Sequence, residues 1–80
     1  MKKEKLQNLA VSDSGFIFDP ITGHSYSTNE VGLEILNLLK KGESVDSIVS
    51  TMIEEYDTSR DELLVDIEDF IDTLKNYLLV

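Results

Sequence analysis

The apolar residues of this chain change their spacing part-way along it. Between Phe16 and Tyr26 they alternate, as in two short strands joined by the turn sequence Asp19-Pro20-Ile21-Thr22-Gly23. From Ser27 onward they recur every three or four residues, as they do on helices. This order predicts a small α+β domain with its strands before its helices, and such a sheet can leave one strand edge free for a partner.

Three strands are expected. The first is placed at residues 6–11, where the apolar residues do not alternate cleanly, and the second at residues 16–18. The third is placed at residues 24–27, after the five-residue connection. We therefore expect a three-stranded antiparallel sheet followed by three helices.

The first two helices have recognisable start and stop signals. Ser27 and Glu30 have the spacing of a capping box, and Lys40-Lys41-Gly42 supplies cations and a glycine for the helix end. The second helix is expected to begin near Ser44 and to carry one apolar face as far as Tyr56.

The third helix is expected to begin at a second capping box, Ser59 to Glu62, and to run to Leu78. One apolar stripe continues along it. We interpret its other face as solvated; that face carries the acids Glu62, Asp66, Glu68, Asp69 and Asp72.

Length and composition limit the possible functions. The 80 residues are expected to form one domain, 1–80, which is too small for a deep catalytic cavity. The chain has no cysteine, and no apolar run long enough for a signal peptide or a membrane span, so we expect a cytoplasmic protein that binds no membrane. Sixteen acids against seven Lys and Arg give a net charge of −9, which argues against nucleic acid as a partner.

Few residues are candidates for chemistry. His24 is the only histidine and has no neighbouring histidine or cysteine with which to bind a metal or act as a base. The four glycines are isolated and form no phosphate-binding loop. We therefore expect no enzymatic activity, no metal and no cofactor.

Two alternative functions remain open. Asp46-Ser47-Ile48 at the start of an acidic helix resembles an acyl carrier protein, in which Ser47 would carry a phosphopantetheine arm. A winged-helix DNA-binding protein would share the predicted fold, although this chain lacks the positive charge that such a protein needs.

Nearly the whole chain resembles the PqqD family of small peptide chaperones, also called precursor-peptide recognition elements. The order of hairpin, asparagine-opened helix, glycine stop and final helix carries the resemblance. The matching residues are Gly15-Phe16-Ile17-Phe18-Asp19, Thr22-Gly23, Tyr26, Asn29, Val31-Gly32, Ile35-Leu36, Gly42, Ile48-Val49, Tyr56-Asp57, Asp66-Ile67, Phe70-Ile71, Leu74 and Leu78-Leu79. The chain has no counterpart of the Pro-Glu segment found in members that serve pyrroloquinoline quinone synthesis.

The resemblance implies a winged helix-turn-helix-like fold and a non-catalytic task. That task is to bind the leader segment of a ribosomally made precursor peptide and to present it to a modifying enzyme, often a radical S-adenosylmethionine enzyme. The leader would add as a strand beside the third strand and lie against the third helix. The implied binding residues are His24, Ser25, Tyr26, Ser27, Leu64, Ile67, Phe70, Ile71 and Leu74.

Two expectations follow for such binding. The negative charge of the chain predicts a basic partner surface, and hence association that salt slows. Proline in place of Ser25 or Tyr26 is expected to remove a hydrogen-bond donor from the strand edge.

Overall fold

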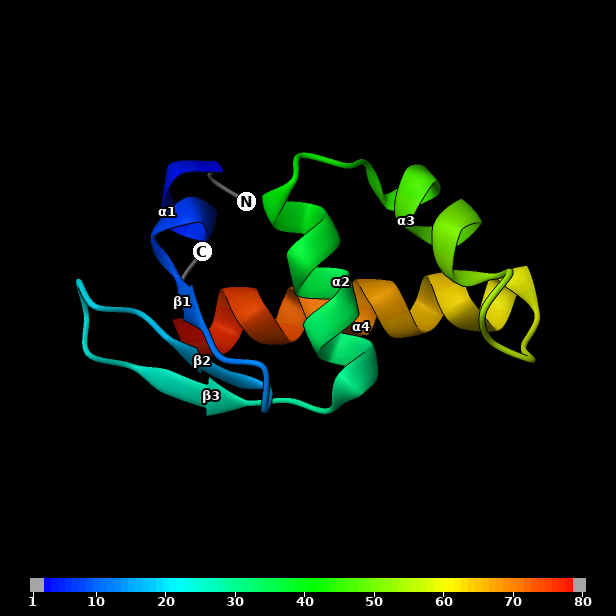
Figure 1. Ribbon diagram of the computed structural model, residues 1–80. Coiled ribbons are helices and arrows are strands. Elements are labelled where there is room, and N and C mark those ends of the chain that lie inside the picture. Colours follow the sequence, from blue (N-terminus) through cyan, green and yellow to red (C-terminus); the bar gives the residue numbers. More distant parts are fainter. Residues whose placement is uncertain (1–2, 79–80) are drawn as a thin grey trace.

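The computed structural model describes residues 3–78, in which strands precede most of the helices (Figure 1). The elements are α1 (Lys3–Asn8), β1 (Ala10–Val11), β2 (Phe16–Phe18), β3 (Ser25–Ser27), α2 (Glu30–Lys40), α3 (Val45–Met52) and α4 (Arg60–Leu78). The expected α+β order, with a sheet followed by three helices, is confirmed. Helix α1 was not expected.

The sheet of the described chain is antiparallel, in the order β1-β2-β3. Strand β2 is central, and Ile17 in its middle is fully buried and lies opposite Tyr26 of β3. The connection between β2 and β3 is held by Asp19, whose carboxylate accepts the Ile21 N–H at 2.9 Å and the Thr22 hydroxyl at 3.0 Å. These hydrogen bonds, with that to Ile21 the largest cause, lower the pKa of Asp19 below its ordinary value.

The expected first strand at residues 6–11 is wrong in its first half. Residues up to Asn8 belong to α1, and only Ala10–Val11 pairs with β2. Leu6 and Leu9 are both buried, and their three-residue spacing suits a helical turn better than a strand. Lys40 fixes this segment to the end of α2 by donating from Nζ to the Leu9 carbonyl at 2.7 Å.

Two helix boundaries also differ from expectation. Helix α2 is capped by Asn29, whose Oδ1 accepts the Gly32 N–H at 2.9 Å, because the expected cap Ser27 is still in β3. Helix α3 begins after the expected cap Ser44 but ends at Met52, so Tyr56 lies in the following turns. The cap of α4 is confirmed, since Ser59 Oγ accepts the Glu62 N–H at 3.2 Å.

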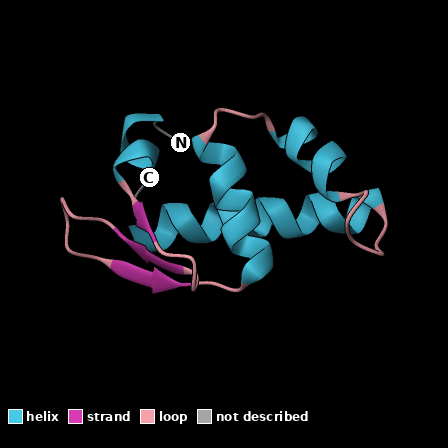
Figure 2. Ribbon diagram, viewed as in Figure 1, coloured by secondary structure: helices cyan, strands magenta, loops and turns pink. Residues whose placement is uncertain are grey.

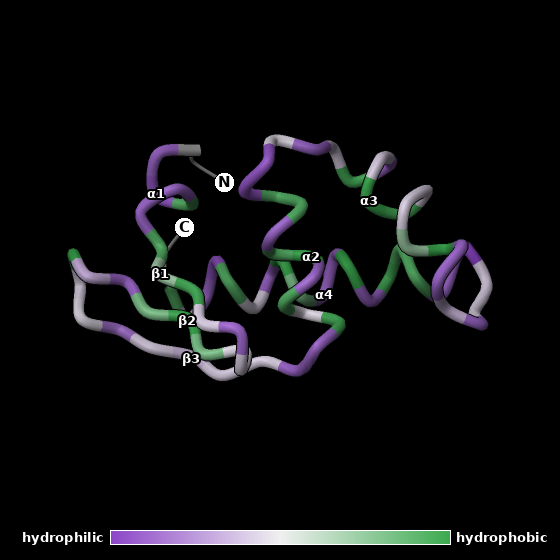
Figure 3. The backbone as a smooth tube through the Cα atoms, in the orientation of Figure 1, coloured by the Kyte–Doolittle hydropathy of each residue, from purple (hydrophilic) through white to green (hydrophobic). Residues whose placement is uncertain are grey.

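Helix α4 runs along the length of the described structure, and α2 crosses it (Figures 1 and 2). The sheet packs near the C-terminal end of α4, and α3 lies toward the other end. Apolar and polar segments alternate along α2, α3 and α4 (Figure 3). The largest fully buried side chains come from β2 and all three long helices; they are Ile17, Ile35, Leu36, Ile48, Val49, Met52, Ile67, Leu74 and Leu78.

Between residues 3 and 78 there is no helix whose length and apolar character would let it cross a membrane.

Candidate functional site

Two backbone hydrogen bonds fix how β3 is oriented against β2. The Asp19 N–H donates to the His24 carbonyl, and the Thr28 N–H donates to the Gly15 carbonyl, both at 2.8 Å. These two pairs bracket β3 at its start and at its end. In an antiparallel ladder, hydrogen-bonded pairs alternate with pairs that turn their backbone groups outward.

The alternation assigns a direction to each residue of β3. Tyr26 lies in the hydrogen-bonded position opposite Ile17, so its N–H and C=O face β2. Ser25 and Ser27 turn their N–H and C=O groups away from β2, toward an edge on which the described chain places no further strand. The expectation that proline at Tyr26 would remove an edge donor is therefore wrong, whereas Ser25 does offer one.

A surface pocket of about 410 Å³ lies beside this edge. It is bounded by the residues that follow β3, the first turns of α2 and the middle of α4. We call it the β3–α4 groove, and its lining residues are Tyr26, Thr28, Asn29, Val31, Gly32, Ile35, Asp66 and Phe70. The lining is mixed, with apolar side chains such as Val31 and Phe70 beside the carboxylate of Asp66.

Gly32 brings the elements around the groove close together. A Cβ at this position would lie 2.0 Å from the Thr28 hydroxyl oxygen and 2.9 Å from Cε1 of Phe70. Gly15, just before β2, also packs closely against Thr28: a Cβ there would lie 2.3 Å from the Thr28 carbonyl oxygen, and its φ of +92° also favours glycine. The groove thus depends on close contacts at Gly15 and Gly32 that a side chain at either position would prevent.

One flank of α4 faces β3. Asp66, Phe70 and Tyr77 lie within about 40° of one another around the helix, given 100° per residue. Asp66 and Phe70 line the groove, and the Tyr77 ring lies 5.5 Å from the Tyr26 ring at 40°. The Tyr pair therefore continues the groove-facing flank toward the end of α4.

The structure brings together only part of the set of binding residues expected from sequence. Tyr26 and Phe70 line the groove, while Ser25 and Ser27 form its open edge and His24 precedes β3 with its side chain exposed. Two further positions are core residues, because Ile67 and Leu74 have no exposed surface and can only support the groove from beneath.

Leu64 and Ile71 lie farther from the groove than expected. Both are half-buried against the core, and neither lines the groove. They are about 100° or more around α4 from Phe70, on the other side of the buried stripe. The flank that faces β3 is therefore the one that contains Asp66, which the sequence assigned to a solvated face.

Several groove residues were missed from sequence. Val31, Gly32 and Ile35 come from the first turns of α2, which were not among the expected binding residues. One signal was available, because a glycine inside a helix costs stability and often marks a close approach. The spacing of residues in the sequence does not show that Asp66 and the α2 residues line the same groove.

The residues behind the alternative functions have structural roles. Ser47, the candidate carrier serine, is half-buried in the first turn of α3, where its hydroxyl donates to Glu43 Oε1 at 2.6 Å. Among the residues described, no three His, Asp or Glu side chains gather to hold a metal ion. The described cations Lys5, Lys40, Lys41, Arg60 and Lys75 are spread over α1, α2 and α4 and their ends, and form no stripe.

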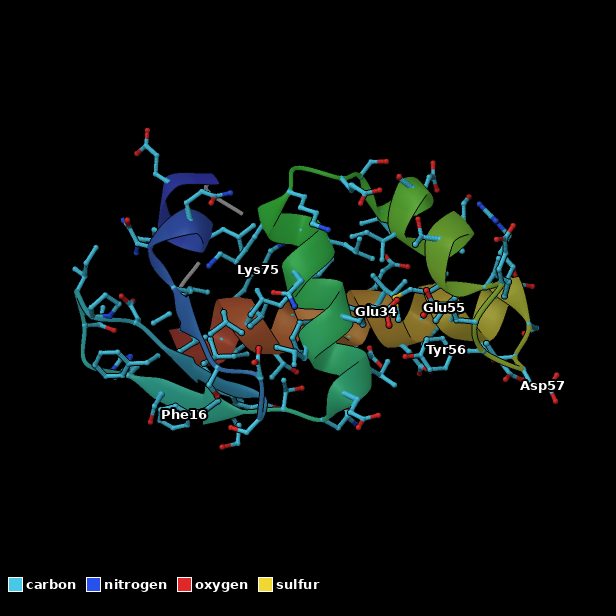
Figure 4. The ribbon with its side chains drawn as sticks, in the orientation of Figure 1. Phe16, Glu34, Glu55, Tyr56, Asp57 and Lys75 are labelled. Atoms are coloured by element: carbon cyan, nitrogen blue, oxygen red, sulfur yellow. The ribbon has the colours of Figure 1, made fainter. Side chains whose placement is uncertain are left out.

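Glu34, Glu55 and Tyr56 lie together away from the groove, where α2 passes the turns after α3 (Figure 4). The Tyr56 hydroxyl donates to Glu34 Oε1 at 3.1 Å. A hydrogen bond with Glu34, partial desolvation and the charge of Glu34 raise the pKa of Glu55. Desolvation and the same carboxylate raise the pKa of Tyr56. These groups join α2 to the α3–α4 connection and do not contact the groove.

Comparison with known proteins gives one family and two similar structures. Residues 15–80 match the model of the family described as Coenzyme PQQ synthesis protein D (PqqD). TbiB1 in complex with the TbiA(beta) leader peptide is 29% identical, with a TM-score of 0.76 over 85% of this chain and 80% of that chain. Lasso peptide synthetase B1 complexed with the leader peptide is 25% identical, with a TM-score of 0.74 over 85% and 81%. A search of curated proteins gives no match.

Proposed function

We propose that this chain, which belongs to the PqqD family, is a non-catalytic peptide chaperone that binds the leader segment of a ribosomally made precursor peptide. The observation that carries the proposal is the outward-facing edge of β3 beside the β3–α4 groove. Two structures similar to this one were solved with leader peptides bound.

The physical basis of binding is strand addition. Ser25 and Ser27 offer two N–H donors and two C=O acceptors, which suit an extended peptide that pairs with β3. Side chains on one face of that peptide would point toward the groove, where Val31 and Phe70 can bury apolar groups. Backbone pairing would give affinity, and the groove would give selectivity.

Titration of the labelled full chain tests this proposal. The probes are synthetic peptides that tile any short peptide encoded beside its gene. We expect one peptide to shift the amide signals of Ser25, Ser27 and Phe70 and to leave those of α3 unchanged. Shifts confined to α3, or no binding by any tile, would contradict the proposal.

Proline substitution provides the matched variant. Ser27→Pro removes an outward N–H and should weaken binding by about tenfold or more, because a donor is lost and the proline ring obstructs the edge. Ser27→Ala keeps the N–H and should bind like the wild type. Equal binding by both variants would mean that the peptide does not add to β3.

The proposal extends to the enzyme that receives the peptide. On the family resemblance this is a radical S-adenosylmethionine enzyme, and we place the transfer in the cytoplasm, where ribosomes make the precursor. Co-purification of the full chain with the proteins encoded beside it tests this part. Recovery of a modifying enzyme of another class would contradict the radical enzyme while leaving leader binding intact.

A further inference from the structure

Among the described residues that line the β3–α4 groove, Asp66 alone is charged. It projects from α4 one turn before Phe70, and no hydrogen bond or ion pair joins it to any side chain that the structure describes. A second surface pocket, of about 360 Å³, continues past it toward the start of α4 and is lined by Asp61, Glu62, Val65 and Asp66. No described lysine or arginine lines either pocket.

The start of α2 also borders the groove, and a helix N-terminus favours anions. Here that end is already satisfied. Asn29 accepts the Gly32 N–H, and Glu30 places a carboxylate in the first turn. The local charge at the groove is therefore negative.

We propose that Asp66 determines which leader is bound, by selecting a lysine or arginine in the leader. This inference rests on the proposed function and deepens it. The long apolar stem of such a side chain can lie over Phe70 and Val31, which leaves its cation at the Asp66 carboxylate. The basic residue belongs at the end of the added strand that lies next to Ser27, because the groove opens beyond that end of β3.

The test uses a displayed library of random twelve-residue peptides, selected on the full chain. We expect enrichment of Lys or Arg at one position, at a fixed distance from an apolar residue. Asp66→Asn should weaken binding of a selected peptide about three- to fivefold, the usual effect of a partly exposed ion pair. The same peptide with glutamine in place of its basic residue should bind both proteins equally.

Glu68→Gln is the matched control. Glu68 is exposed on α4 about 200° around the helix from Asp66, and the two substitutions change the net charge equally. We expect it to leave the affinity of both peptides unchanged. Asp66→Lys should instead select peptides with Asp or Glu at the same position, and thermal unfolding shows whether each variant is folded.

The outcomes separate this inference from the proposed function. Selected peptides that lose binding with Ser27→Pro but show no basic preference, or that prefer acids with the wild type, would overturn the role of Asp66 alone. Equal losses with Asp66→Asn and Glu68→Gln would do the same. Failure to select any peptide, or binding that survives Ser27→Pro, would overturn the proposed function and this inference with it.

Discussion

Gly32 is the residue on which the shape of the groove depends most directly. It allows Thr28 and Phe70 to approach α2 from two sides, at distances that no side chain at this position would permit. Because the same contacts form the groove wall, a substitution here should act on stability and on binding together. Asp66 differs in this respect, since it touches solvent and should act on binding alone.

Gly32→Ala is expected to reduce the free energy of unfolding by about 1–3 kcal/mol, because the added methyl group overpacks the junction. It should also weaken peptide binding, since Phe70 must move into the groove. Denaturant unfolding and peptide titration measure the two effects. The double variant Thr28→Ala/Gly32→Ala removes the nearer obstacle and should recover part of the stability. A fully stable Gly32→Ala protein with unchanged binding would contradict this account of the groove.

At the level of single residues, sequence spacing identified the strand that carries the edge but not the direction of its backbone groups. Whether Ser25 or Tyr26 turns its N–H outward depends on the register with β2, which is set by the length and geometry of the turn at residues 19–23. Side-chain alternation in β3 is too short to reveal that register. The groove-facing position of Asp66 depends in the same way on how α4 is rotated against the sheet.

Helix α1 shows what an individual element adds to the fold. It lies outside the region that matches the family model, which begins at residue 15. Leu6 is buried. The Gln7 side chain donates to the Lys40 carbonyl, and the Lys40 side chain donates to the Leu9 carbonyl, so α1 and the residue after it are joined to the end of α2. Its apolar residues were misassigned to a strand because two buried leucines three residues apart are too few to establish a helical period.

Leu6→Ala is therefore expected to destabilise the protein by about 2–4 kcal/mol, the usual cost of a cavity left by a buried leucine. Peptide affinity, measured where the variant is fully folded, should remain unchanged, because α1 does not line the groove. Thermal unfolding and titration at low temperature check the two halves of this prediction. A loss of affinity in the folded variant would mean that α1 contributes to the site.

The contact between α2 and the turns after α3 should respond to pH. The pKa of Glu55 is raised above its ordinary value of 4.5, so the folded state holds this proton more tightly than the unfolded state. The resulting stabilisation is complete below pH 4.5 and is lost as the pH rises through the raised pKa. Above that pKa the charged Glu55 carboxylate is repelled by the charge of Glu34.

Glu55→Gln should therefore raise the melting temperature at pH 7 relative to the wild type, and this advantage should shrink as the pH falls toward 4. Glu54→Gln, one residue earlier on the same exposed turn, is the control and should show no such dependence. Melting curves between pH 4 and pH 7 provide the measurement. A lower melting temperature for Glu55→Gln at pH 7 would contradict the repulsion.

For the whole molecule, the net charge of −9 acts on a partner at a distance, whereas the open strand edge acts on it only in contact. The charge affects how fast a basic partner approaches, whereas the edge and groove determine how long it stays. Sequence reasoning anticipated the fold and the charge because both depend on patterns that extend over the whole chain. The groove was less predictable, since it is made by three elements that meet only after folding.

Association with a basic peptide should therefore depend on salt. Raising the salt concentration from about 0.05 M to about 0.5 M should slow association roughly tenfold, with a much smaller change in the dissociation rate. Stopped-flow fluorescence measures both rates. A peptide of the same sequence with neutral residues in place of its basic ones should show little dependence. Association rates that do not change with salt would contradict electrostatic steering.

The central claim is that the outer edge of β3 is open and receives a peptide strand. Hydrogen exchange of individual amides, measured without and with a bound peptide, tests it most directly. In the free protein we predict slow exchange at Tyr26 and fast exchange at Ser25 and Ser27, and we predict that binding slows Ser25 and Ser27. Slow exchange at these two serines before peptide is added, or fast exchange that persists after saturation, would contradict the claim.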